Sequence, residues 1–477
     1  MYNYLYSSVI FRKIVNEFGA QNIDARMVVF QRMIFSGGNL VLKQLIMRKI
    51  RKNVAGIDIG AKKVFVGIEK ARVKSFDTFT ENLENLGDYL VSHKITSVAM
   101  ESTGVYWVIL YDILTSKGLD VWLVDGRSTR QVPGRKTDVK DCQWIQQLHS
   151  YGMLNRCFVA EELIQELRTY QRLREDHIRS SAMHINHMQK SLILMNIRLK
   201  EVLSQIHGAS GLRIIRAILS GERDAKKLTA LCHTSILKTK KDFVLKSLKG
   251  HYHESALFSL GQAVTCYDFY QEQISKCDVK LEQVLKKMHQ DKPNQKVSKA
   301  RKPIRHHKPN VRKMDQYLLN IFYGKDATVL PGITDYNWMQ LLAEVGTDLK
   351  KWKTEKHFTS WLGLAPKQHN SGKRNRNYKS KGTPKAGLIF KQAAVGLLNS
   401  KHIALGAFGR KIRAKKGGLV AIKAVARKLA ELYWKLFVKG LEYVEIGIQK
   451  YQERMLLNKQ RTVARMAKEL GMETIII

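Results

Sequence analysis

Four carboxylates, spread over three segments of the chain, are candidates for holding metal ions. Asp58 ends the apolar run NVAGID, and Glu101 ends a second run, TSVAME. Asp138 and Asp141 lie three residues apart at the start of a predicted helix, so they share one face of it. A buried carboxylate is costly without a cation, and hard cations such as Mg²⁺ prefer oxygen ligands. The set indicates phosphoryl transfer assisted by two metal ions.

Each acid alone has a plainer explanation. An Asp-x-Gly sequence at a strand end is a common turn, and acids in the first turn of a helix often offset its macrodipole. The order and spacing of all four acids are more specific than any one of them.

A serine lies in a strongly basic segment near the C-terminus. Between Lys367 and Lys428 there are 17 Lys or Arg residues and no Asp or Glu. Ser371, in the sequence HNSGKRNR, would need a base or a positive field to act as a nucleophile. On chemistry alone, a phosphate hydrogen bond is the more common role for such a serine. The cations that we expect to contact nucleic acid are Lys373, Arg374, Arg376, Lys379, Lys381 and Lys385.

The elements that would position the acids follow a mixed α/β pattern. From Arg51 to about Leu154 we expect three strands at hairpin spacing, then helices alternating with the strands 97–101 and 120–124, then the helix at Asp138. This order suits a ribonuclease-H-like fold. We therefore predict an α/β domain followed by helical regions.

The middle of the chain is predicted to be helical. From about Glu161 to Ile206, apolar residues alternate spacings of three and four, as in a coiled-coil seam that packs within the chain or against a second protomer. Histidines 177, 184 and 187 on this helix are expected to face solvent or phosphate. The residues between Lys286 and Lys313 include eleven Lys or Arg and one acid, as expected of a basic linker. The seam residues are Ile185, Met188, Leu192, Met195, Leu199, Val202 and Ile206.

A Pro-Gly turn at Leu330–Ile333 opens another helical pattern. Such a turn resembles a helix-hairpin-helix, whose amides meet DNA phosphates, and ordinary helix packing explains it equally well.

Composition limits the partners. The 477 residues include 82 Lys or Arg against 41 Asp or Glu, a formal net charge of +41. A folded protein with this excess is expected to bind a polyanion. Ribosomal or membrane-surface proteins share the charge but would not need the acids. Five cysteines without CxxC spacing predict reduced thiols, and we expect a cytoplasmic protein without membrane spans.

The ordered motifs GIDIGAKKVFVGI, AMESTGVYW, GRKTDVKDCQWI, WLGLAP, HNSGKRNR and AVARKLAELYW closely resemble the insertion-sequence 110 family of transposases, also called DEDD transposases. The resemblance covers roughly residues 51–440. It implies that Asp58, Glu101, Asp138 and Asp141 match the family's metal-binding tetrad on a RuvC-like domain, and that Ser371 matches its nucleophilic serine.

The resemblance also implies partners and an assembly. Family members recombine double-stranded DNA through a phosphoserine link, use a structured bridge RNA as guide, require Mg²⁺ and work as homo-oligomers, here expected to be dimers to tetramers of a bacterial or archaeal, nucleoid-associated protein. The domains expected are an extension of unknown role (1–50), a RuvC-like domain (51–158), a helical coiled-coil region (159–290), a basic linker (291–325), a mainly helical serine transposase domain (326–440) and a helical tail (441–477).

Three other functions use some of the same features. A ribonuclease-H-like nuclease of the junction-resolvase type would use the acids with water and leave Ser371 structural. An actin-like ATPase or sugar kinase also begins with a strand and an Asp-x-Gly loop, but no second phosphate loop follows. A pure RNA-binding protein would leave the acids unexplained. Asp125, where the family pattern predicts an uncharged polar residue, is either a fifth acid near the metals or a turn residue.

Overall fold

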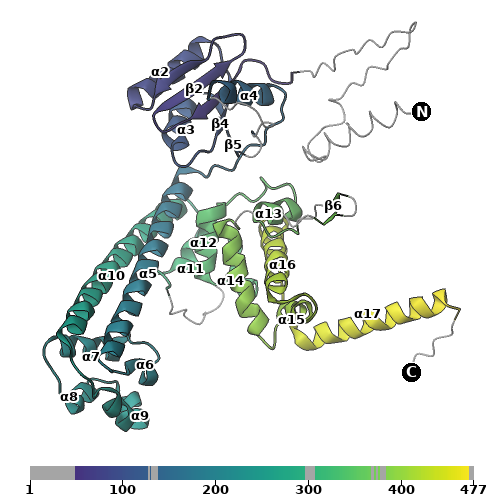
Figure 1. Ribbon diagram of the computed structural model, residues 1–477. Coiled ribbons are helices and arrows are strands. Elements are labelled where there is room, and N and C mark those ends of the chain that lie inside the picture. The colour runs from purple at the N-terminus through teal and green to yellow at the C-terminus, as the bar shows by residue number, and fades with distance from the viewer. Residues whose placement is uncertain are drawn as a thin grey trace, which may run out of the picture. The chain divides into compact units, whose positions relative to one another are not determined.

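The computed structural model describes residues 49–126, 129, 138–295, 307–366, 370, 371, 374, 375 and 383–471 (Figure 1). The expected N-terminal extension and the centre of the expected basic linker lie outside these residues. The chain divides into two compact units between Val159 and Ala160. Within the described residues, no helix has the length and apolarity needed to cross a membrane.

The first unit is built on a five-stranded sheet. Its order is β3-β2-β1-β4-β5, in which β2 runs antiparallel to β1 and β3 while β1, β4 and β5 run parallel. The predicted mixed sheet is confirmed, and its topology is consistent with a ribonuclease-H-like domain. The strands are β1 (Val54–Ile59), β2 (Lys63–Ile68), β3 (Lys74–Asp77), β4 (Ser97–Glu101) and β5 (Asp120–Val124).

Helices cover both faces of this sheet (Figure 1). Helices α2 (Thr80–Ser92) and α3 (Trp107–Ser116) pack on one face, where Ile57 and Met100 are fully buried with them. Helix α4 (Asp138–Ser150) covers the other face through a smaller apolar cluster that includes Ala99 and Ile145. The alternation of side chains along each strand therefore assigns every second residue to the α4 side.

Two glycines allow α4 to lie close to the sheet. Gly56 and Gly67 are partners in the β1–β2 ladder. A Cβ atom added to Gly56 would lie 2.2 Å from the backbone nitrogen of Gln146, and one added to Gly67 would lie 3.0 Å from that of Gln143. The helix backbone thus rests on a part of the sheet that has no side chains.

The second unit begins with a long helical hairpin. Helices α5 (Glu162–Leu194) and α10 (Glu254–His289) lie side by side (Figure 1), and an ion pair between Arg174 and Asp278 is buried between them. The connection at the tip folds into its own apolar core. That connection contains α6 (Leu199–Val202), α7 (Ala209–Leu219), α8 (Ala225–Ala230) and α9 (Thr234–Ser247).

The prediction that the seam lies on one continuous helix is wrong beyond Leu194. Helix α5 ends there, and Asn196 has a φ of +55°, which breaks the helix. Leu199 and Val202 lie on α6 and are buried in the tip core together with Met188. The apolar spacing of three and four residues continues past the break because residues on both sides of the break are buried in the same core. That core is formed within one chain.

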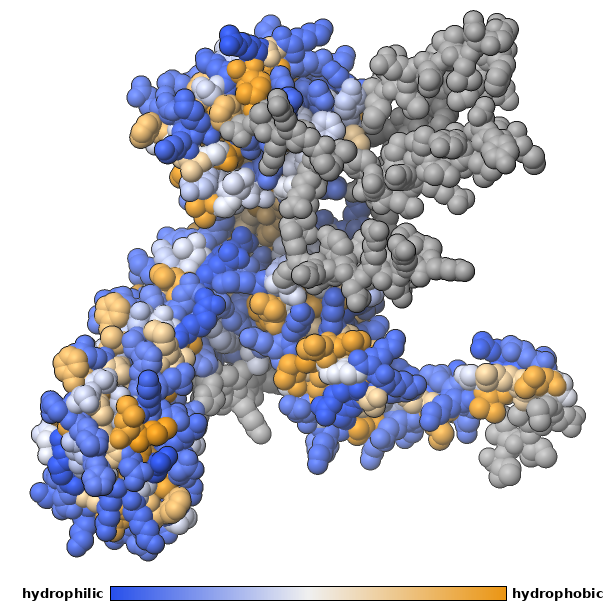
Figure 2. All heavy atoms as spheres, in the orientation of Figure 1, coloured by the Kyte–Doolittle hydropathy of each residue, from blue (hydrophilic) through white to orange (hydrophobic). Residues whose placement is uncertain are grey.

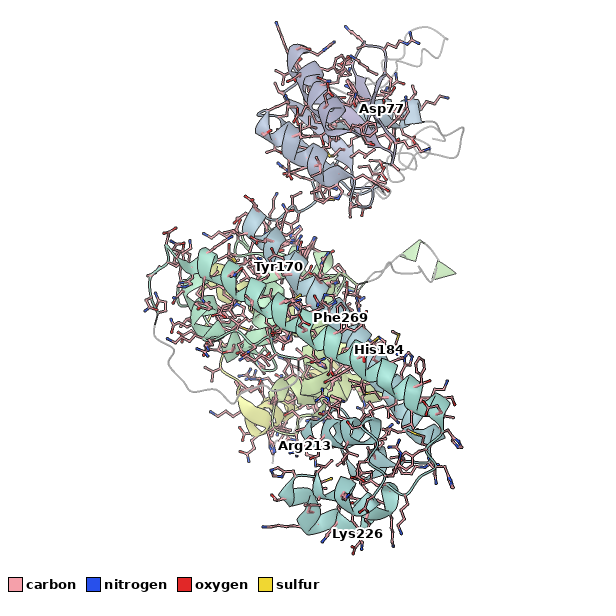
Figure 3. The ribbon with its side chains drawn as sticks, turned by 90° about the vertical axis from the view of Figure 1, so that its left-hand side faces the viewer. Asp77, Tyr170, His184, Arg213, Lys226 and Phe269 are labelled. Atoms are coloured by element: carbon pink, nitrogen blue, oxygen red, sulfur yellow. The ribbon has the colours of Figure 1, made fainter. Side chains whose placement is uncertain are left out.

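Histidines on α5 pack against aromatic residues of α10. The His184 ring stacks on Tyr270 with centroids 5.6 Å apart, and burial and the neighbouring His187 lower the pKa of His184. Figure 3 shows His184 and Phe269 on the two helices of the hairpin. His184 is half-buried by this stacking, and its expected contact with solvent or phosphate stays a prediction.

The rest of the second unit is a helical domain around large aromatic side chains. Trp338, Phe358, Phe390 and Tyr433 are fully buried. A two-strand hairpin, β6 (Asn370–Ser371) with β7 (Arg374–Asn375), interrupts the helices. The other elements are α11 (Met314–Ile321), the 3-10 helix η1 (Ala327–Val329), α12 (Asp335–Val345), α13 (Glu355–Trp361), α14 (Lys385–Asn399), α15 (Ala404–Lys416), α16 (Gly418–Lys439) and α17 (Gly447–Glu469).

The Pro-Gly turn lies between η1 and α12 and packs on α14. Leu330 and Ile333 are buried, and a Cβ on Gly332, whose φ is +75°, would lie 3.1 Å from Leu397. Helix packing accounts for this turn.

Much of the surface is hydrophilic. Figure 2 shows hydrophilic side chains over most of the visible face of the α5–α10 hairpin, and apolar ones near the far end of α17. Those apolar residues include Val463, Met466 and Leu470, each more than half exposed.

Candidate catalytic site

Asp58 and Glu101 are brought together by strand register. In the parallel β1–β4 ladder, Ile57 is the partner of Met100, so the next residue on each strand is a carboxylate. Ile57 and Met100 point to the α2–α3 side, which turns Asp58 and Glu101 toward the α4 side. Both acids are half-buried at the same edge of the sheet. Strand β4 ends at Glu101, as predicted, whereas β1 continues one residue beyond Asp58, to Ile59.

Helix α4 brings Asp141 to this side of the sheet. The thiol of Cys142 has its pKa raised to about 12, first by burial, then by the negative charge of Asp58, with a smaller contribution from Asp141. Both carboxylates are therefore near this thiol. Asp138 is the first residue of α4, as predicted, and its side chain lies outside the described part of the structure.

Glu101 is held by residues that the sequence analysis did not identify. The Thr129 hydroxyl donates a hydrogen bond of 2.9 Å to Glu101 Oε2, and the Trp144 indole donates to the Thr129 carbonyl at 3.0 Å. A Cβ on Gly126 would lie 2.0 Å from Glu101 Oε1. These contacts orient the carboxylate. No motif in the sequence marks Thr129, because its contact with Glu101 joins residues that are 28 positions apart in the chain.

The three described acids suit a hard divalent cation in the type of their donor atoms but are not grouped closely enough to hold one. Asp58, Glu101 and Asp141 supply only oxygen, the ligand type that Mg²⁺ prefers. In the part of the chain that the structure describes, no three Asp, Glu, His or Cys side chains are grouped closely enough to hold a metal ion. The Asp138 side chain, the fourth expected ligand, is outside that part.

Asp125 has a different neighbour from the other acids. It follows β5, and its charge contributes, after burial, to raising the pKa of Cys157 to about 11. Cys157 packs against the core on the α2–α3 side of the sheet. The charge of Asp125 therefore acts on the Cys157 thiol.

A buried polar cluster lies at the opposite edge of the sheet. His149, fully buried, has its Nε2 atom 2.8 Å from the Ser97 hydroxyl, which also contacts Asp120. The Arg51 guanidinium lies 4.0 Å from the Trp122 ring centroid and, with burial as the larger cause, lowers the pKa of His149 to about 4. The cluster fixes the C-terminal end of α4. Sequence reasoning missed it because its members come from four separate segments.

The loop after Glu101 exposes apolar side chains. Val105 is 77% exposed and Tyr106 is 51% exposed. Two backbone hydrogen bonds, Thr103 N to Glu101 O and Tyr106 N to Thr103 O, keep this loop next to the end of β4. Apolar groups therefore border the carboxylate site.

Ser371 lies in the second unit. Its backbone pairs with that of Arg374 in the β6–β7 hairpin, and neither side chain is described. Lys385 is described, and its ammonium lies 3.5 Å from Glu175 of α5, so this cation already has a partner within the chain. Four of the expected phosphate contacts lie outside the described residues: Lys373, Arg376, Lys379 and Lys381.

Two family models match different parts of the chain. A DEDD model described as "Transposase" matches residues 55–197, which include β1 to β5, α4 and α5. A second, described as "Transposase IS116/IS110/IS902 family", matches residues 327–405, which include the β6–β7 hairpin and α14. No curated protein matches the sequence. Over these two segments, the chain is similar to IS110-family transposases.

Proposed function

We propose that this chain, matched by two transposase models, is a DNA recombinase of an insertion sequence that joins DNA to Ser371 during strand exchange. The observation that carries the proposal is the alignment of Asp58 and Glu101 at the ends of adjacent parallel strands, with Asp141 on the helix above them. Carboxylates placed together in this way suit phosphoryl transfer, because their oxygen atoms can hold cations beside a phosphodiester.

Asp58, Glu101, Asp138 and Asp141 would hold the divalent ions, for which Mg²⁺ is our proposal. When bound, these ions supply charge neutralisation at the scissile phosphate.

In the proposed step, Ser371 Oγ attacks the scissile phosphorus. The new Oγ–P bond forms as the bond from phosphorus to the 3′ oxygen breaks. The serine hydroxyl gives up one proton and the departing 3′ oxygen takes up one, so the step releases no net proton. A 3′-hydroxyl of another strand then attacks the phosphorus of the phosphoserine. This forms a new phosphodiester bond and restores the Ser371 hydroxyl. Because the phosphoserine conserves the phosphodiester bond energy, rejoining needs no external energy source. Positive charge around Ser371, including Lys373, Arg374 and Arg376, would stabilise the negative charge that develops on the phosphate.

The partners proposed are duplex DNA and a structured guide RNA. A net charge of +41 is large enough to hold several nucleic-acid segments at once. Carboxylates and serine lie in different compact units, so we propose a homo-oligomer in which the RuvC-like unit of one protomer can serve the serine of another.

The test is adduct formation with the purified full-length protein. Protein, DNA carrying the element's ends, the flanking noncoding RNA and Mg²⁺ are incubated and separated under denaturing conditions. We expect a covalent protein–DNA band that disappears in Ser371→Ala and when the RNA is omitted. DNA cleavage that continues in Ser371→Ala without any covalent band would instead favour a nuclease that uses water.

A further inference from the structure

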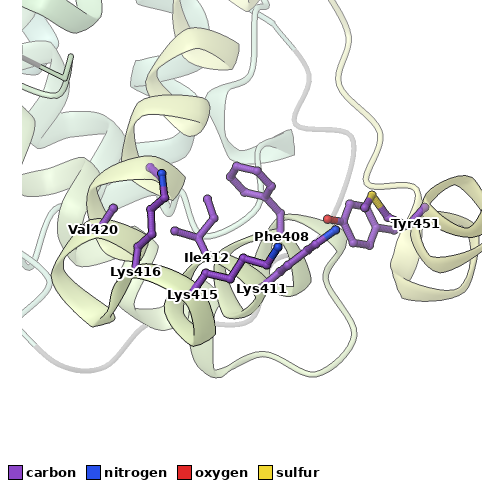
Figure 4. Close-up of a pocket in the computed structure, with 9 residues that line it drawn as sticks. Phe408, Lys411, Ile412, Lys415, Lys416, Val420 and Tyr451 are labelled. Atoms are coloured by element: carbon purple, nitrogen blue, oxygen red, sulfur yellow. The ribbon is translucent and has the colours of Figure 1, made fainter. Parts of the chain in front are cut away.

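A pocket in the second unit lies where α15, α16 and α17 meet (Figure 4). Its volume is about 440 Å³, within the range of sites that hold small organic groups. The lining residues are Phe408, Lys411, Ile412, Lys415, Lys416, Val420, Ala424, Tyr451 and Met455.

The pocket combines an apolar lining with two aromatic rings. Phe408 comes from α15 and Tyr451 from α17, and both are half-buried. Ile412, Val420 and Met455 complete an apolar surface on which a flat ring can pack. Such a surface excludes a free phosphate or a metal ion as the sole occupant, because neither gains from apolar contact.

Three lysines surround the apolar lining, as Figure 4 shows for Lys411, Lys415 and Lys416. None of the three forms an ion pair with the residues that the structure describes. Cations in the last turn of α15 stabilise that helix through its dipole, which accounts for Lys415 and Lys416. The dipole does not account for Lys411, which precedes the last turn, or for the aromatic rings beside it.

No acid competes for these ammonium groups at the pocket. Its lining contains no Asp or Glu. On α16, Glu431 is paired with Arg427 and Lys428. Glu445, before α17, accepts hydrogen bonds from the Ala404 backbone and the Tyr443 hydroxyl. The occupant should therefore be an anion that also carries a flat apolar ring.

We propose that this pocket holds one unstacked nucleotide of a single-stranded RNA segment, with its base against Phe408 and Tyr451 and its flanking phosphates on the three lysines. Bases inside duplex DNA are stacked and cannot enter, whereas folded RNA presents unpaired bases in loops and bulges. The inference rests on the proposed function only in taking RNA as a partner.

Photochemical crosslinking of the full-length protein to a short RNA with one 5-iodouridine tests the contact directly, because this base reacts with an aromatic ring on which it stacks. We expect the crosslinked peptide to contain Phe408 or Tyr451. A crosslink confined to peptides outside the pocket would overturn the inference, as would crosslinking of the matching single-stranded DNA but not of the RNA.

Affinity measurements provide a second readout. Phe408→Ala should weaken binding of the short RNA roughly tenfold, since stacking on one aromatic ring contributes about that much. Phe258→Ala removes a ring that is 66% exposed on α10 and should leave affinity unchanged. Equal affinities for wild type and Phe408→Ala would contradict the proposal, and so would a changed oligomeric state with unchanged RNA affinity, which would mean that a second copy covers the pocket.

Lys411→Gln keeps the proposal testable if Phe408→Ala fails to fold, because Lys411 is exposed. It should reduce the slope of log affinity against log salt by about 0.7, the value for one contact to a single strand. An unchanged slope would count against the contact. None of these assays requires strand exchange, so a missing serine adduct would refute the proposed function and leave this inference standing.

Discussion

Gly56 and Gly67 face each other across the β1–β2 ladder, and the backbone of α4 lies directly over both. This contact sets the height of α4 above the sheet, and with it the position of Asp141 relative to Asp58. The glycines are required by packing, since neither has a positive φ.

Substituting Gly56→Ala should displace α4. The added Cβ would lie 2.2 Å from a backbone nitrogen and 2.3 Å from the Cys142 carbonyl oxygen, which no side-chain rotation can relieve. We expect the free energy of unfolding to fall by roughly 3 kcal/mol. Formation of the protein–DNA adduct should also decrease, because Asp141 moves with α4 relative to Asp58. Gly67→Ala, with its closest contact at 3.0 Å, is the matched control and should cost about 1 kcal/mol. Urea denaturation checks both values, and equal losses would contradict the account.

The sequence was sufficient to predict the strands that carry Asp58 and Glu101 and the helix that starts at Asp138. Apolar runs ending in acids, and a polar turn before an amphipathic segment, are local signals. The glycine contact was not predictable, because it depends on the pairing of two strands and on a helix 75 residues or more further along. The seam prediction failed at Asn196, since apolar spacing records burial and does not record a break in the backbone.

Thr129 is expected to tune metal binding through Glu101. Thr129→Val keeps the shape of the side chain and removes the hydroxyl that donates to Glu101 Oε2. The loss of a partner that orients a ligand weakens metal binding, so the Mg²⁺ concentration for half-maximal adduct formation should rise about tenfold. Thr129→Ser retains the hydroxyl and should behave like the wild type. A Mg²⁺ titration distinguishes them, and identical curves for Val and Ser would refute the role.

The buried ion pair of the helical hairpin should dominate its stability. Arg174 and Asp278 have side chains only 3% and 9% exposed, and Asp278 also accepts from the Asn310 backbone at 2.9 Å. Asp278→Asn leaves a buried guanidinium without its countercharge, at a cost of about 3–5 kcal/mol.

The control is Asp268→Asn, which removes a pair with Arg216 whose side chains are 46% and 53% exposed. Such exposed pairs contribute about 0–1 kcal/mol. Thermal unfolding followed by circular dichroism compares the two variants. A loss at Asp278 no greater than at Asp268 would show that the buried pair is dispensable.

His149 should make the first unit sensitive to acid. Its pKa is about 4 in the folded protein, below its ordinary value of 6.5. The unfolded chain therefore takes up a proton first as the pH falls, and the free energy of unfolding decreases from pH 6.5 down to about pH 4. The shift sets an upper limit of about 3 kcal/mol on this decrease. His149→Gln, which does not titrate, should flatten the pH dependence, measured by urea denaturation at pH 7 and pH 5. An equally steep loss in the variant would exclude His149 as its source.

The most direct test of the proposed chemistry is mass spectrometry of the covalent protein–DNA complex after digestion with protease and nuclease. The account predicts one modified peptide, carrying a nucleotide phosphate on Ser371, and no such peptide from Asp58→Asn or Glu101→Gln, although both variants still bind DNA and RNA. A nucleotide attached to any other residue, or a Ser371 adduct formed equally well without Asp58 and Glu101, would contradict it.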